Sequence, residues 1–94
     1  MKLRLSPRAR EDIQEIGRYL RERSPGGALQ VRNELKAALQ LIREHPNAGR
    51  DLGGHLRRLP ASRVPYLIFY RIDELANAVD VVTIRHAARA PEDG

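Results

Sequence analysis

The sequence predicts a two-layer α+β domain of the order β-α-α-β-β-β, with an antiparallel sheet covered on one face by an α-helical hairpin. Three observations support this fold class. The chain opens with strand-like alternation, two stretches with apolar residues at helical spacing follow, and three short strand-like segments close it. The length of 94 residues suits a single domain, 1–94. Because only 4% of the residues are aromatic, the core must consist mainly of Leu, Ile, Val and Ala.

The first strand leads directly into the first helix. Residues 2–6 alternate between apolar and polar side chains, which is typical of a short, half-buried strand. Ser6 is a favoured N-cap, and Pro7 suits the first helical position, where its missing N–H costs nothing. Glu11 and Asp12 follow early in the helix, where the helix dipole favours anions. The apolar stripe of this helix consists of Ala9, Ile13, Ile16 and Leu20.

A second helix is predicted over residues 26–45. The Ser-Pro-Gly-Gly sequence at 24–27 repeats the helix-start pattern, and Pro46 ends the helix. The connection between the two helices is short, so we expect them to run antiparallel as a hairpin. The apolar stripe of the second helix consists of Ala28, Val31, Leu35, Ala38, Leu39 and Ile42.

The C-terminal half predicts three strands with antiparallel meander pairing. A loop rich in Gly, Pro and Asn spans residues 45–54. The strands are predicted at 56–59, 66–72 and 79–85. The first strand of the chain can join this sheet antiparallel to its sequence neighbour, and the tail, residues 90–94, is expected to fray.

The charge of the chain favours an anionic partner. There are 17 Lys plus Arg against 12 Asp plus Glu, giving a net charge of +5, and all but two of the basic residues are Arg. Arg binds carboxylates and phosphates through paired hydrogen bonds, so the partner is expected to be nucleic acid or an acidic protein. A GC-rich genome is an alternative explanation for the excess of Arg over Lys.

Several classes of protein are disfavoured. No apolar run approaches the ~20 residues of a transmembrane helix, and the N-terminus lacks the apolar core of a signal peptide. The absence of Cys excludes disulfides and thiolate metal sites. No two His lie at metal-ligand spacing with a third donor. We therefore expect a cytoplasmic protein with no membrane partner, no metal and no other cofactor.

Four stretches carry motifs in a fixed order. Leu5–Ile13 contains S-x-x-A-x-x-D-I, and Ile42–Arg50 reads I-x-x-x-P-x-x-G-R. Leu56–Leu59 leads to the aromatic block Tyr66–Ile72, and Ile84–Arg89 closes the chain. Together they resemble the RelE/ParE superfamily of toxins from type II toxin–antitoxin systems, and its ParE branch in particular.

The resemblance implies a growth-inhibiting toxin that is neutralised by a cognate, ParD-like antitoxin, in a toxin–antitoxin hetero-oligomer of the kind that stabilises plasmids. The antitoxin typically lays a helix along the helical hairpin. ParE-type toxins inhibit DNA gyrase by binding, whereas RelE-type toxins cleave mRNA on the ribosome. Fold alone does not choose between these two functions. A nucleic-acid-binding module that has lost toxicity is a third possibility.

The resemblance also implies where catalytic residues would lie. RelE-type toxins place basic residues at positions that are Leu67 and Ala87 here, so an enzyme is less expected than a binding protein. If the chain is a metal-independent endoribonuclease, its catalytic residues are expected to be Arg58, Arg71, Arg85, His86 and Arg89. For target binding, the expected residues are Arg71, Arg85, His86 and Arg89.

Each candidate also has a structural interpretation. His86 could pack at a strand end, and Arg71 could pair with a nearby carboxylate. Arg57 and Arg58 are adjacent in a strand, so they point to opposite faces, and Tyr66 and Tyr70 are expected in the core. The antitoxin is expected to contact Tyr19, Leu29, Leu41 and Arg57, although the three apolar residues could be scattered surface residues.

Overall fold

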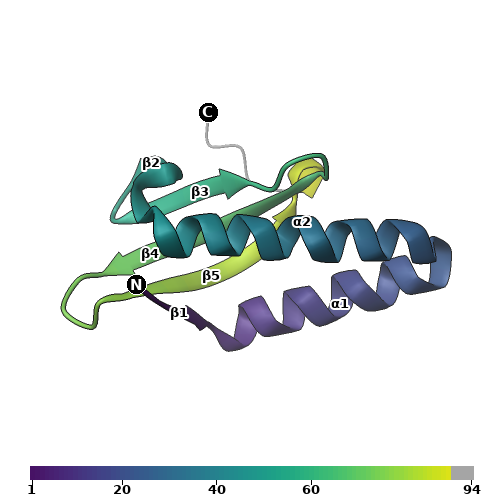
Figure 1. Cartoon of the computed structure of the whole chain (residues 1–94), viewed down its shortest axis with the longest axis horizontal. Helices are drawn as coiled ribbons and strands as arrows, with labels where there is room; N and C mark the ends of the chain where they lie inside the picture. The colour runs from purple at the N-terminus through teal and green to yellow at the C-terminus, as the bar shows by residue number, and fades with distance from the viewer. Residues whose placement is uncertain (90–94) are drawn as a thin grey trace.

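The computed structural model describes residues 1–89 and has two layers (Figure 1). The helices are α1 (Pro7–Arg23) and α2 (Pro25–Glu44). The strands are β1 (Lys2–Leu5), β2 (Arg50–Gly53), β3 (Leu56–Pro60), β4 (Tyr66–Asp73) and β5 (Ala78–His86). Two short 3₁₀ turns, η1 (Pro46–Ala48) and η2 (Ala87–Arg89), follow α2 and β5. The tail predicted at 90–94 lies outside the described residues.

Both predicted helix starts are confirmed by their caps. The side chain of Ser6 accepts a hydrogen bond from the backbone N–H of Ala9, and Ser24 caps α2 in the same way through Gly27. A proline occupies the first helical position in each case. Ser24 closes α1 and opens α2 at once, so the two helices fold back on each other as an antiparallel hairpin (Figure 1).

One face of the sheet packs against the helical hairpin to form the main core. The buried residues of α1 and α2 in this core are Ala9, Val31, Leu35, Ala38 and Ile42. The strands contribute Tyr66, Ile68, Tyr70, Val79, Val81 and Ile84. Tyr66 and Tyr70 are therefore core aromatics, as the sequence predicted. Burial of apolar surface against the sheet, more than helix propensity, is what holds such helices in place.

The sheet is mixed, and the prediction of an antiparallel sheet is wrong on this point. Its strand order is β1-β5-β4-β3-β2, with β1 parallel to β5 and every other pair antiparallel. The predicted loop at 45–54 is the second difference, because it contains η1 and the edge strand β2.

The extra strand explains the position of β1. β2 reverses the chain once more before β3, so β3 runs in the same direction as β1 and cannot pair antiparallel with it. β2 also occupies the outer edge of β3. The free edge that remains belongs to β5, where β1 pairs from Lys2 opposite Ala78 to Leu5 opposite Val81.

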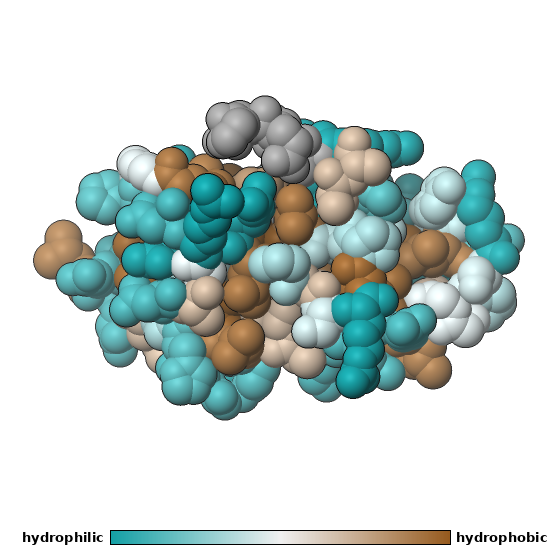
Figure 2. All heavy atoms as spheres, turned by 90° about the horizontal axis from the view of Figure 1, so that it is seen from above, coloured by the Kyte–Doolittle hydropathy of each residue, from teal (hydrophilic) through white to brown (hydrophobic). Residues whose placement is uncertain are grey.

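The face of the molecule seen from above (Figure 2) is mainly polar, with small apolar areas. Figure 2, seen from above Figure 1, shows apolar residues reaching the surface in several separate areas among polar ones. The large hydrophobic residues that are exposed include Tyr19, Leu29 and Leu41. No helix within residues 1–89 is long and apolar enough to cross a bilayer.

Candidate functional site

The face of the sheet that turns away from α1 and α2 carries a second, smaller set of side chains. Successive residues of a strand point to opposite faces. In β4, Tyr66, Ile68 and Tyr70 belong to the main core, whereas Leu67 and Phe69 form a separate cluster with strand residues alone. We call this second surface the open face. Its side chains from β2 to β5 include Arg50, Leu52, Leu56, Arg58, Leu67, Phe69, Arg71, Asp73, Asp80 and Arg85.

Four arginines lie on the open face, one from each of the strands β2 to β5. Cross-strand partners share a face. Arg58 is opposite Phe69, Arg50 is opposite Arg58, and Arg85 is opposite Leu67. Arg71 is opposite Leu56 on one side and Asp80 on the other. None of the four arginines makes an ion pair with a carboxylate of residues 1–89.

The centre of the open face is apolar but covered. Leu67 and Phe69 are each only 8% exposed, and the partly buried Leu52 and Leu56 pack against them. A register shift between Asp51 and Gly53 lies at Leu52 in β2. In the strand register the four arginines are therefore neighbours of an apolar centre that is largely buried.

At the β1 end of the open face, charged side chains form ion pairs. Arg4 of β1 donates from Nη2 to Oδ2 of Asp80 at 2.9 Å and to Oδ2 of Asp73 at 3.0 Å, and its Nε also binds Asp80. The hydrogen bond from Arg4 lowers the pKa of Asp80. Arg4 thus binds both carboxylates of this end, and Asp80 also lies opposite Arg71. With Arg4 counted, the arginines of the open face still outnumber these two carboxylates.

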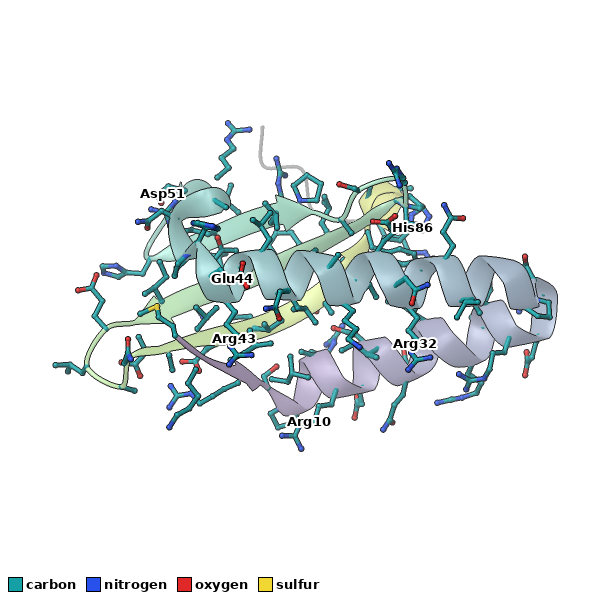
Figure 3. All side chains as sticks on the ribbon, in the orientation of Figure 1. Arg10, Arg32, Arg43, Glu44, Asp51 and His86 are labelled. Carbon is teal, nitrogen blue, oxygen red and sulfur yellow. The ribbon has the colours of Figure 1, made fainter. Side chains whose placement is uncertain are left out.

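His86 lies on the opposite face of the sheet from the arginines. It pairs in register with Tyr66, and the two rings pack edge to face with centroids 5.3 Å apart. Its Nδ1 accepts a hydrogen bond from the backbone N–H of Ala88. Burial raises the pKa of Tyr66. Figure 3 shows His86 at the far end of the sheet from Asp51 in β2.

The residues predicted as a catalytic set are therefore divided. Arg58, Arg71 and Arg85 share the open face, whereas His86 is on the helix-covered face and Arg89 is in η2. Within residues 1–89, no three His, Asp or Glu side chains are grouped so that they could hold a metal ion.

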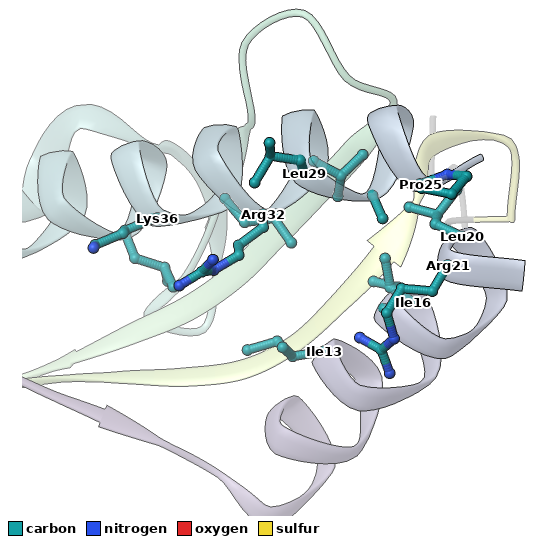
Figure 4. Close-up of a pocket in the computed structure, with 13 residues that line it drawn as sticks. Ile13, Ile16, Leu20, Arg21, Pro25, Leu29, Arg32 and Lys36 are labelled. Atoms are coloured by element: carbon teal, nitrogen blue, oxygen red, sulfur yellow. The ribbon is translucent and has the colours of Figure 1, made fainter.

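A second candidate site is a groove between the two helices, with a volume of about 730 Å³. We call it the helix groove. Its apolar lining includes Ile13, Ile16 and Leu20 from α1 and Leu29 and Leu39 from α2. Its charged lining residues are all basic: Arg21, Arg32 and Lys36. Figure 4 shows Arg21 and Arg32 projecting into the space between the helices from α1 and α2.

The structure separates the four residues that were expected to bind the antitoxin. Leu29 is 55% exposed and lines the helix groove, whereas Tyr19 and Leu41 are exposed outside it. Arg23 of α1 covers the ring of Tyr19, with its guanidinium carbon 3.9 Å from the ring centroid. Arg57 lies on the helix-covered face and donates to the backbone carbonyl of Gly49 at 2.7 Å.

Two parts of these sites were missed from the sequence. Arg50 was assigned to a loop, although its place beside Arg58 puts it on the open face. The basic residues of the helix groove were not singled out either. Their spacing in α2, with Arg32 and Lys36 four residues apart, places them on one side of that helix and could have indicated a basic rim.

The chain matches known proteins along nearly its whole length. A family model described as the ParE toxin of the type II toxin–antitoxin system, parDE, matches residues 3–91. Toxin RelE2 of Caulobacter vibrioides is 37% identical over 82 residues, covering 87% of this chain and 90% of that protein.

Two solved structures share the fold. The chromosomal ParDE toxin–antitoxin system from P. aeruginosa has a TM-score of 0.76 at 21% identity, covering 92% of this chain and 95% of that one. The intact E. coli RelBE toxin–antitoxin complex has a TM-score of 0.70 at 22% identity, covering 94% and 98%. These likenesses confirm the RelE/ParE-like α+β fold that the motifs predicted.

Proposed function

The chain belongs to the ParE family of toxins from type II toxin–antitoxin systems, and from this premise we propose that it inhibits DNA gyrase by binding, without chemistry of its own. Its neutralising partner is a ParD-like antitoxin. The observation that carries the choice of a binding mechanism is the separation of His86 from the arginines of the open face.

Cleavage of RNA through a 2′-hydroxyl requires a base to remove a proton, an acid to return one, and cations to stabilise the phosphorane. The open face supplies cations, but an Arg side chain stays protonated and cannot exchange protons near neutral pH. The tyrosines and the histidine of the five strands, Tyr66, Tyr70 and His86, all lie on the helix-covered face. The open face is therefore better suited to holding an anionic partner than to cleaving one.

The alternative function is ribosome-dependent cleavage of mRNA, as in RelE-type toxins. The names of relatives favour it, since the chain is 37% identical to a protein named toxin RelE2. In this alternative, Arg58, Arg71 and Arg85 would hold the phosphate, and the proton transfers would have to come from groups outside the open face.

We assign antitoxin binding to the helix groove. An apolar channel of this kind accepts the apolar face of an amphipathic helix. The basic residues Arg21, Arg32 and Lys36 favour acidic side chains along the flank of that helix. The structural likeness to the ParDE system and to the RelBE complex supports a partner of this class.

The test is a gyrase supercoiling assay with the purified chain, with and without its antitoxin, beside a ribosome-dependent mRNA cleavage assay. We expect supercoiling to stop at increasing toxin concentration, the antitoxin to restore it, and mRNA to stay intact. Cleaved mRNA together with unaffected supercoiling would replace the gyrase proposal by the RelE-like alternative.

A further inference from the structure

We propose that the open face is a DNA-binding surface, on which Arg50, Arg58, Arg71 and Arg85 contact the phosphates of duplex DNA held by the target enzyme. This inference rests on the proposed function, because gyrase works on DNA. It adds a second contact of the toxin, to the nucleic acid and not only to the enzyme, and it assigns that contact to one face of the sheet.

The first argument is that this surface carries an excess of positive charge, because five arginines, Arg4 included, share it with the carboxylates of Asp73 and Asp80. Arg50 and Arg58 are directly opposite each other on β2 and β3, an arrangement that destabilises a strand pair. The two carboxylates of the face, Asp73 and Asp80, are both bound by Arg4. A bound polyanion would relieve the repulsion between Arg50 and Arg58, and its counterions would be released on binding.

The second argument concerns the kind of anion. Acidic proteins bind tightly where an exposed apolar centre anchors the interface and a polar rim surrounds it. Here the apolar centre is small and largely buried, since Leu67 and Phe69 are 8% exposed and the partly buried Leu52 and Leu56 pack against them. What the surface offers a partner is guanidinium groups, which bind phosphate oxygens bidentately.

The third argument favours a duplex over a single strand. Proteins that bind single-stranded nucleic acid stack its bases on exposed aromatic rings. Phe69 is the aromatic residue of the open face, and its burial leaves no such platform among the described residues. The four arginines come from four adjacent strands, so they spread over roughly 14 Å across the sheet at about 4.8 Å per strand. Contacts of this type position a protein on the phosphate backbone without reading its sequence.

The salt dependence of binding to duplex DNA tests directly whether the open face contacts phosphates. Fluorescence anisotropy of the purified toxin with a short labelled duplex, over a series of NaCl concentrations, gives both affinity and the slope of log K against log salt. Arg50 and Arg71 are exposed, so R50Q/R71Q changes the surface with little risk to the fold. The matched control is R10Q/R18Q, which removes two exposed arginines of α1 outside both sites.

We expect R50Q/R71Q to weaken DNA binding by at least about tenfold and to reduce the salt slope by about two, one for each lost phosphate contact. The control is expected to bind as the wild type does. R58Q/R85Q gives a second pair on the same face and should act in the same direction. Equal losses in both surface pairs and in the control would mean binding by net charge alone and would overturn the proposal.

Three further outcomes bear on this inference, and the first separates it from the proposed function. Wild-type toxin that inhibits gyrase but does not bind duplex DNA would overturn the DNA surface and leave gyrase inhibition standing. An RNA duplex of the same sequence, bound more tightly than the DNA, would also overturn it and would favour the RelE-like alternative. If the open face contacts DNA held by gyrase, R50Q/R71Q should lose gyrase inhibition. R10Q/R18Q should retain it.

Discussion

Asp12 of α1 accepts a hydrogen bond from the backbone N–H of Ile84 in β5 at 3.0 Å, and its carboxylate also accepts one from the hydroxyl of Thr83. β1 covers the edge of β5 only as far as Val81. Beyond that point Ser6 binds the carbonyl of Val82, and Asp12 takes the next N–H. Ser6 and Asp12, at the start of α1, therefore bind the backbone edge of β5 that β1 does not reach. These hydrogen bonds join the helix layer to the sheet.

Replacement of Asp12 should test this edge. D12A leaves the buried N–H of Ile84 without a partner, so we expect the free energy of unfolding to fall by about 3 kcal/mol. E11A, at the exposed neighbouring position, is the control and should change stability by less than about 0.5 kcal/mol. Urea denaturation followed by circular dichroism measures both. Equal effects of the two substitutions would contradict a structural role for Asp12.

The same carboxylate predicts a loss of stability in acid. Burial raises the pKa of Asp12, but the hydrogen bonds from Thr83, Ile84 and Arg8 together outweigh it, so the pKa lies below its ordinary value of 3.8. A carboxyl group whose pKa is lower in the folded state stabilises the protein above its unfolded pKa. That stabilisation is lost as pH falls through the folded value. The stability difference between wild type and D12N should therefore shrink below about pH 4. A difference that stays constant in acid would be contrary to this assignment.

A tight contact between Gly49 and Tyr70 predicts a second stability effect. The Tyr70 hydroxyl donates to the carbonyl of Pro46 at 2.6 Å and accepts from the N–H of Gly49 at 2.8 Å. A Cβ at Gly49 would lie 2.5 Å from that hydroxyl oxygen and 2.8 Å from the ring, which is fully buried. G49A should thus lose about 1–3 kcal/mol of stability through overpacking.

Gly26 provides the control for this substitution. It lies in the first turn of α2, and a Cβ there would meet nothing within 4 Å. G26A is expected to leave stability unchanged or to raise it by up to about 1 kcal/mol, because Ala is the better helix former. Thermal unfolding of the two variants side by side decides the matter, and a G49A protein as stable as G26A would show that Tyr70 can move aside.

Local patterns predicted the parts of the fold that local contacts form. Both helix starts were predictable because Ser-Pro supplies the cap and the first helical residue within two positions. β2 was not predictable, because its lead-in at Pro46 and Gly49 is held by Tyr70, more than twenty residues away. The direction of β1 relative to its neighbour in the sheet depends on β2. The wrong prediction that β1 pairs antiparallel therefore followed from missing β2.

The candidate sites, like the fold, were predictable from the sequence only in part. Arg58, Arg71 and Arg85 were singled out by the family pattern, and strand alternation places them together once the register is known. The face of His86 depends on a register shift in the pairing of β4 with β5, which the sequence does not show. Leu29 and Leu41 both lie off the apolar stripe of α2. Only the position of α1 reveals that Leu29 borders the helix groove.

The helix groove predicts a difference between those two leucines in antitoxin binding. L29R adds a cation to a groove whose charged residues are already basic and removes apolar surface, so the complex should weaken by at least about tenfold. L41R makes the same change at a position that is 41% exposed outside the groove, and should alter affinity by less than about threefold. Calorimetric titration with the antitoxin measures both. Equal weakening would mean that the antitoxin covers the outer side of α2 as well.

His86 provides the last test, because the two functional alternatives require different things of it. As a packing residue it contributes a ring edge-to-face with Tyr66, which Phe can supply, so H86F should fold and inhibit gyrase within about twofold of the wild type. As an acid–base catalyst it would be irreplaceable, and H86F would lose about 100-fold or more of any mRNA cleavage. H86A is the companion variant, since it removes the ring contact and should lower thermal stability while leaving inhibition by the folded protein intact. Inhibition that disappears in H86F at unchanged thermal stability would give the imidazole a role in target binding and would contradict the packing role argued here for His86.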